Sequence, residues 1–215
     1  MAGIVASLAV TACTTTRQAP AEAAAPTPAE QARADRGRPP YTPADVQFMQ
    51  GMIRHHAQAI VMTSLASTHA ARQDVKILAG RIDVSQQDDI AFMQRWLRER
   101  NETVPEIDAR HDMGGHQMPK PGASGSELMP GMLTAAQLTQ LSAARGPEFD
   151  RLFLTFMIKH HEGALTMVDR LFSSQGAAQE SNVFQFASDV EIDQNTEIER
   201  MRGMLRALSL SGRNP

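Results

Sequence analysis

With 215 residues, the chain has room for one ordinary domain plus tails, since domains commonly run to about 100–200 residues. Its 21 Lys and Arg against 24 Asp and Glu give a formal charge of -3 without a basic cluster that could follow a phosphate backbone, which excludes nucleic acid as an expected partner. Aromatic residues make up only 5%, and turn signals are sparse inside the periodic regions, so the composition favours packed helices over a sheet.

Residues 1–13 resemble an export signal that ends in a bacterial lipobox. A short apolar run at residues 4–10 leads to Val-Thr-Ala-Cys13, and the run is too short to span a bilayer. The basic residues that usually begin such a signal are missing. We expect an exported lipoprotein whose Cys13 carries the lipid and whose domain faces the periplasm or the cell exterior. The alternative is that Cys13 is a buried or reactive thiol.

Residues 14–41 are rich in Ala, Pro, Thr and Gln and contain almost no large apolar side chains. Such a segment cannot bury a core, and we expect a disordered tether between the membrane and the domain. The folded domain is expected over residues 42–208, followed by a tail at 209–215.

Two copies of one helical hairpin organise this domain. One segment recurs 105 positions later, as from His55 to His160, and a second segment recurs 108 positions later, as from Met93 to Met201. The first segment repeats Asp45, Phe48, Met52, Ile53, His55, His56, Ala59 and Met62. We expect hairpin one at 42–100, a linker with a short helix at 101–146, and hairpin two at 147–208.

The apolar residues of each copy fall at three- and four-residue intervals, which is the helical period. Thr42-Pro43 and Gly146-Pro147 mark helix starts, and the stretch from Thr134 to Gln137 resembles a capping box for the short helix. Two amphipathic hairpins must bury their apolar faces on each other. The expected fold is an all-α, ferritin-like four-helix bundle with internal pseudo-twofold symmetry.

The repeated Met-x-x-His-His motif indicates a metal site. Four imidazoles placed in register beside an apolar stripe would be costly to bury without partners. Ferritin-like di-iron sites use Glu-x-x-His, whereas this sequence has Met at the Glu position, and thioether with imidazole suits Cu(I). The candidate ligands in the helices are Met52, His55, His56, Met62 and Met93 and their counterparts Met157, His160, His161, Met167 and Met201, with Met204 beside them.

Carboxylates lie one turn before the methionines of the partner helices, and amides lie about one turn earlier still on the same face. They are Gln86, Asp89, Gln194 and Glu197. We interpret them as hydrogen-bond acceptors that fix the imidazole tautomers. Direct coordination by Asp89 and Glu197 would instead suit iron or manganese, and the pattern leaves this choice open. It also leaves open which histidine of each pair is the ligand.

The linker repeats the same residue types in a Gly- and Pro-rich setting, where core packing explains them poorly. Its candidate ligands are His111, Met113, His116, Met118, Met129 and Met132. A flexible Met- and His-rich segment can bind a soft ion and exchange it readily. The alternative is a solvated linker without a metal.

The sequence resembles the family catalogued as domain of unknown function 305. The resemblance rests on the two His-His motifs, the Met-Pro-Gly-Met segment before the second hairpin, the Gly-x2-Phe-Asp motif at residues 146–150 and the Gln-x2-Glu-Ile-x2-Met motif. The resemblance covers about residues 45–206. It implies a ferritin-like four-helix bundle that is usually exported, copper binding, and a role in copper tolerance or trafficking.

The leading hypothesis is therefore a non-enzymatic copper protein that buffers Cu(I) or relays it to a copper-trafficking partner. A second hypothesis is a ferritin-like oxidoreductase that holds iron, manganese or redox-active copper with the four histidines, Asp89 and Glu197. A third is that the histidine pairs are structural. Ser64, Ser173 and Ser174 have no placed base that would indicate a hydrolase. The oligomeric state does not follow from the sequence.

Overall fold

The structure is a computed structural model that describes residues 41–107 and 128–211. All of these residues belong to one compact unit. These residues form five helices and no strand, which confirms the all-α class predicted from the sequence. The predicted lipobox at Cys13 and the tether up to residue 40 lie outside the described residues.

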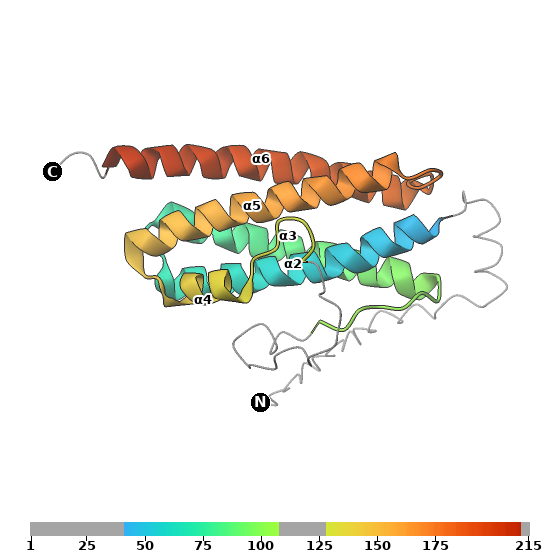
Figure 1. Cartoon of the computed structure of the whole chain (residues 1–215), viewed down its shortest axis with the longest axis horizontal. Coiled ribbons are helices and arrows are strands. Elements are labelled where there is room, and N and C mark those ends of the chain that lie inside the picture. Colours follow the sequence, from blue (N-terminus) through green and yellow to red (C-terminus); the bar gives the residue numbers. More distant parts are fainter. Residues whose placement is uncertain (1–40, 108–127, 212–215) are drawn as a thin grey trace, which may run out of the picture. The chain divides into compact units, whose positions relative to one another are not determined.

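Four of the helices are long and one is short (Figure 1). The long ones are α2 (Pro43–His69), α3 (Gln73–Glu99), α5 (Gly146–Ser173) and α6 (Ser181–Ser211), and the short one is α4 (Ala135–Ala143). The elements therefore follow the order of the predicted hairpins and short helix. No helix within the described ranges carries an apolar run long enough to cross a membrane.

Local sequence explains where two of the helices begin. The Thr42 side chain accepts a hydrogen bond from the Asp45 amide, and the Asp45 carboxylate accepts one from the Thr42 amide at 2.6 Å. Thr134 and Gln137 form the same reciprocal cap on α4. Each cap satisfies amide groups that the first helical turn leaves free. Both helix starts predicted from these residues are confirmed.

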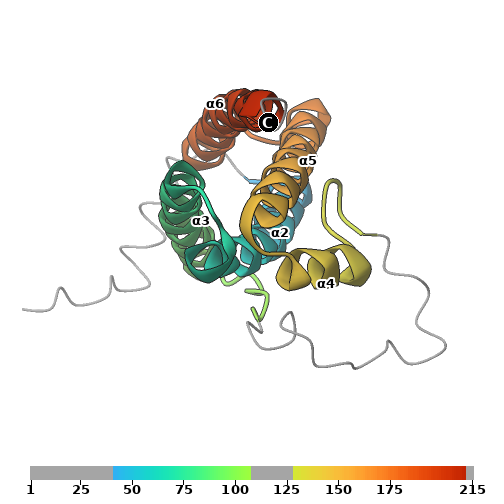
Figure 2. The same ribbon diagram turned by 90° about the vertical axis from the view of Figure 1, so that its left-hand side faces the viewer.

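The helices pack as two hairpins joined along α2 and α5. Helix α3 lies against α2, α6 lies against α5, and α2 contacts α5, while α4 rests on α2 and α5 (Figure 2). A cavity of about 440 Å³ between α3 and α6 is lined by residues of both helices.

A repeated aspartate connects each hairpin to the loop of the other. Asp45 on α2 accepts a hydrogen bond from the Ala178 amide at 2.7 Å, in the loop between α5 and α6. Its counterpart Asp150 on α5 accepts from the amides of Ala71 and Arg72, each at 3.1 Å, in the loop between α2 and α3. Both aspartates are fully buried. Each carboxylate thus satisfies backbone amides of a loop between two helices.

The buried apolar residues separate into two clusters. The Phe149 cluster joins the end of α2 and the start of α3 to the start of α5, the end of α6 and α4. The Phe48 cluster joins the start of α2 and the end of α3 to the end of α5 and the start of α6. Each cluster therefore contains residues from both hairpins, and the buried side chains between the two clusters along each helix are polar.

Candidate metal centre

A layer of buried and half-buried polar residues lies between the two apolar clusters. Helices α2 and α5 supply two histidines each, and α3 and α6 supply an amide and a carboxylate each. We call this set the histidine layer, and its members are His55, His56, Gln86, Asp89, His160, His161, Gln194 and Glu197. The four imidazoles are at most 1% exposed. The four long helices therefore bring these polar residues to one level of the core.

One histidine of each pair contacts a carboxylate of its own hairpin. His56 Nε2 lies 3.1 Å from Asp89 Oδ2, and His161 Nε2 lies 2.6 Å from Glu197 Oε2. The imidazoles are fully buried, whereas the carboxylate side chains are 28% and 21% exposed. Asp89 and Glu197 thus bridge solvent and the interior, and each can hold the tautomer that leaves Nδ1 of its histidine as an electron-pair donor.

The other histidine of each pair faces its counterpart from the opposite hairpin. The rings of His55 and His160 have centroids 3.8 Å apart and are tilted by 36°. His55 Nε2 lies 3.0 Å from the carbonyl oxygen of Pro130, so it donates a hydrogen bond there in the matching tautomer. The two hairpins therefore meet through this ring contact.

Several polar atoms of the layer have no hydrogen-bond partner among the described residues. They are Nδ1 of His55, His56 and His161, both ring nitrogens of His160, and Oε1 of Gln86 and Gln194. Buried polar atoms in folded proteins are normally satisfied by protein, water or an ion. These include five imidazole nitrogens, and because a neutral ring keeps one N–H, each of the four rings could offer one of them to a metal ion as an electron-pair donor.

Burial keeps the central imidazoles neutral. Burial, reinforced by the neighbouring His56, lowers the pKa of His55 from 6.5 to about 3. Burial and then the neighbouring His55 hold the pKa of His160 well below its ordinary value of 6.5. Because metals bind the neutral imidazole, both rings are in the ligand form at neutral pH.

Histidine and carboxylate side chains alone do not make a closed metal site here. Within residues 41–107 and 128–211, no group of three or more His, Cys, Asp or Glu side chains is placed to hold one ion. A metal at this level would therefore need a different additional ligand, such as a thioether, or a shift of the side chains.

Methionines border the histidine layer on both sides. Met52 and Met93 belong to the Phe48 cluster, and Met157 and Met201 belong to the Phe149 cluster. All four are fully buried, and each stands about one helical turn from a histidine or carboxylate of the layer. Their packing is explained by the apolar clusters whether or not they bind an ion.

The remaining predicted methionines are distributed differently. Met62 is fully buried in the Phe149 cluster, and Met204 packs partly buried against the same cluster. Met167, the counterpart of Met62, is only partly buried. The linker residues His111, Met113, His116 and Met118 lie outside the described residues, whereas Met129 and Met132 lie within them.

The end of the linker, residues 129–133, packs onto the hairpins, and we call it the docked turn. Gly131 has φ of 76°, and a Cβ added to Gly163 on α5 would lie 2.0 Å from the Pro130 carbonyl oxygen. On α2, the side-chain amide of Gln58 donates a hydrogen bond through Nε2 to the Leu133 backbone carbonyl at 3.0 Å. Its Oε1 accepts a hydrogen bond from the Leu133 backbone N–H at 2.7 Å. This turn holds the Pro130 carbonyl against His55.

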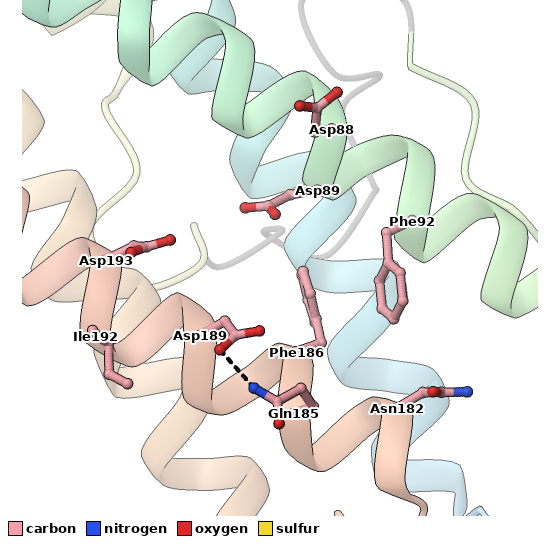
Figure 3. Close-up of a pocket in the computed structure, with 9 residues that line it drawn as sticks. All are labelled: Asp88, Asp89, Phe92, Asn182, Gln185, Phe186, Asp189, Ile192 and Asp193. Atoms are coloured by element: carbon pink, nitrogen blue, oxygen red, sulfur yellow. Dashed lines mark hydrogen bonds between the residues drawn. The ribbon is translucent and has the colours of Figure 1, made fainter.

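The cavity between α3 and α6 is acidic and adjoins the histidine layer at Asp89, and we call it the acidic groove. Figure 3 shows Asp89 from α3 and Asp189 and Asp193 from α6 around the same space, with Asp88 nearby. Burial, followed by the charges of Glu197 and Asp89, raises the pKa of Asp193. The groove therefore presents a negative potential beside the two carboxylates that contact histidines.

Sequence reasoning missed the docked turn and the acidic groove. A difference between the two copies could have indicated the turn. The second copy has Gly163 where the first has Gln58, and the first copy has Gly51 where the second has Phe156. The groove gave no comparable signal, because aspartates on solvated helix faces are common.

Comparisons with known proteins agree with this fold. A sequence model for the family described as "Domain of unknown function (DUF305)" matches residues 45–205. A DUF305 fragment from Deinococcus radiodurans is 29% identical, with a TM-score of 0.62, over 79% of this chain and 99% of its own. CopM in the Cu(II)-bound form is 28% identical, with a TM-score of 0.58, over 76% of this chain and 96% of its own.

A DUF305 protein from Streptomyces coelicolor has a TM-score of 0.63 at 23% identity, over 77% of this chain and 94% of its own, and supports the fold alone. No curated protein matches the chain.

Proposed function

This chain belongs to the DUF305 family, and on that premise we propose that it is a copper-binding protein that holds the ion in its histidine layer. The observation that carries the proposal is a set of buried imidazole nitrogens, at the level where the two hairpins meet, that have no hydrogen-bond partner in the described part of the chain. The similarity to a protein solved with copper bound supports copper as the metal.

The donor set favours Cu(I) within this proposal. Since no three His, Asp or Glu side chains among the described residues converge on one point, thioethers are the natural further ligands. Met52 and Met157 border the layer from opposite sides, and thioether with neutral imidazole is a soft donor set that suits Cu(I). Asp89 and Glu197 then act by orienting His56 and His161.

We further propose that the protein buffers or relays copper rather than catalysing a reaction. A ferritin-like four-helix bundle made of a duplicated hairpin would supply the rigid level of histidines, and the Met- and His-rich linker would capture or pass on the ion. Export with a lipid anchor at Cys13 would place this domain at a membrane surface, where a copper-trafficking protein could exchange metal with it.

A second candidate is a ferritin-like oxidoreductase that uses iron or manganese. It is favoured by the carboxylates of Asp89 and Glu197, which touch histidines on one side and are partly open to solvent on the other. Hard oxygen ligands of this kind suit these metals better than they suit Cu(I).

Metal analysis of the purified chain, combined with an anaerobic Cu(I) competition titration, separates these functions. We expect copper to be retained, and we expect the His56→Gln/His161→Gln and His55→Gln/His160→Gln variants to lose affinity while His69→Gln keeps it. Stoichiometric iron without Cu(I) affinity would exclude the copper proposal. Unchanged metal retention in both double variants, with lower stability, would make the histidines structural.

A further inference from the structure

Two thioethers outside the histidine layer come together over a glycine. A Cβ added to Gly51 on α2 would lie 3.2 Å from Cε of Met167 and 3.6 Å from Sδ of Met129. Met129 comes from the docked turn and Met167 from α5, and both are only partly buried. The same residues line a pocket of about 280 Å³, which we call the thioether pocket. Solvent and ions can therefore reach both methionines.

The pocket exists because the two copies of the hairpin differ at this place. The counterpart of Gly51 in the second copy is Phe156, a buried side chain of the Phe149 cluster. The counterpart of Met167 in the first copy is Met62, which is fully buried in that cluster. One copy thus uses this methionine as core packing, while the other leaves it beside a space opened by glycine.

The lining of the pocket selects for a soft ion of low charge. Thioether sulfur is a soft donor that does not titrate, and it prefers Cu(I) to hard divalent ions. Arg54 and Arg170 also line the pocket, and both are exposed. Their repulsion of a cation grows with the charge of the ion, so a divalent ion is repelled twice as strongly as a monovalent one.

The pocket also adjoins the histidine layer. Pro130 lines it and follows Met129 directly, and its carbonyl oxygen lies 3.0 Å from Nε2 of His55. A displacement of the docked turn would therefore move Met129 and free His55 in the same step.

We propose that Met129 and Met167 form a solvent-accessible site for a soft monovalent ion, Cu(I) or its analogue Ag(I), in the thioether pocket over Gly51. This inference rests on the proposed copper-binding function of the protein but not on the histidine layer. The site receives the ion at the surface, next to His55, which the docked turn contacts through the Pro130 carbonyl.

The test is an anaerobic titration of the full chain, labelled with 13C at the methionine ε-methyl groups, first with Cu(I) and separately with Ag(I). We expect the ε-methyl signals of Met129 and Met167 to shift, at pH 5 as at pH 7 because thioethers do not titrate. The Met129→Leu/Met167→Leu variant should bind one equivalent less of Cu(I). The matched control is Met49→Leu, which changes a fully buried methionine of the Phe48 cluster that is not a candidate ligand, and it should keep the full stoichiometry.

The outcomes separate this site from the histidine layer. If the ε-methyl signals of Met129 and Met167 still shift in the His56→Gln/His161→Gln variant, the result supports an independent surface site. This conclusion holds even if the variant retains all its copper, a result that would contradict the histidine proposal. Unmoved signals for both methionines while Cu(I) binds, or full stoichiometry in the double methionine variant, would overturn the pocket site. Absence of any Cu(I) and Ag(I) binding by the chain would overturn both proposals.

Discussion

At the scale of single residues, the two members of each His-His pair have different surroundings. His56 and His161 are held through Nε2 by partly exposed carboxylates. His55 and His160 face each other across the hairpins and have no carboxylate partner among the described residues. Carboxylates orient the first kind, whereas burial keeps the second kind neutral.

Replacing Glu197 with Gln should weaken copper binding. The Glu197 carboxylate lies 2.6 Å from His161 Nε2, and loss of such an orienting partner typically lowers metal affinity by about 10–100-fold. The measurement is a competition titration with a Cu(I) chelator. Glu199→Gln is the control, since Glu199 lies on the same helix but pairs with the exposed Arg202. Equal affinity of the two variants would contradict an orienting role.

Stability of the metal-free protein should fall as the pH drops below 6.5. In the unfolded chain His55 regains its ordinary pKa of 6.5, while in the folded protein its pKa is about 3. Between these values the unfolded state binds a proton that the folded state does not, so stability is lost at about 1.4 kcal/mol per pH unit. His160, whose pKa is also lowered, adds a loss in the same direction.

Urea unfolding at a series of pH values measures this slope. The variant His55→Gln should show a shallower fall, because one of the two groups no longer takes up a proton on unfolding. An identical slope in the variant and the unmodified protein would show that His55 does not contribute.

At the scale of elements, local signals in the sequence predicted more than long-range ones. The caps at Thr42 and Thr134 and the helical period of the His-His segments were predictable because each depends on neighbours within a turn or two. The contact between Pro130 and His55 could not be predicted, because it depends on how a linker crosses two helices that are distant in the sequence.

The histidine layer was predicted in part. The repeat placed the four histidines and the two carboxylates on corresponding turns, and the structure brings His56 to Asp89 and His161 to Glu197. To predict that His55 and His160 face each other, one must know how each helix is rotated about its axis. Periodicity alone does not determine that rotation to within a fraction of a turn.

Replacing Gly163 with Ala should displace the docked turn. The added Cβ would lie 2.0 Å from the Pro130 carbonyl oxygen and 2.6 Å from Cα of Gly131, which are backbone atoms that a side-chain movement cannot clear. Overpacking of this kind typically destabilises by about 1–3 kcal/mol.

Chemical denaturation compares this variant with Gly80→Ala in α3. A Cβ at Gly80 meets nothing within 4 Å, so this control should gain up to about 1 kcal/mol from the better helix propensity of Ala. Stabilisation by both substitutions would show that the turn does not depend on its contact with Gly163.

At the scale of the whole molecule, the core consists of two apolar clusters with a polar layer between them. Within the described part of the chain, the unsatisfied hydrogen-bonding groups are therefore concentrated in this layer, where the hairpins meet. An ion that binds only the folded state would supply the missing interactions there.

Cu(I) should therefore stabilise the protein against heat. A free concentration of 100 times the dissociation constant corresponds to about 2.7 kcal/mol when the unfolded chain does not bind the ion. Anaerobic thermal unfolding with and without Cu(I) measures the shift in Tm. The His56→Gln/His161→Gln variant should show a smaller shift than His69→Gln, and equal shifts would argue against the histidine layer as the copper site.

The division of the core has a consequence for how the molecule fluctuates. Because each cluster contains residues of both hairpins, the hairpins cannot separate without disrupting both clusters. Subglobal opening should therefore begin at the polar level and not by parting of the hairpins, and amide hydrogen exchange near His55 and His160 should be faster than near Phe149 or Phe48. An ion released from this level would leave through local breathing of the middle of the helices, while both ends remain protected.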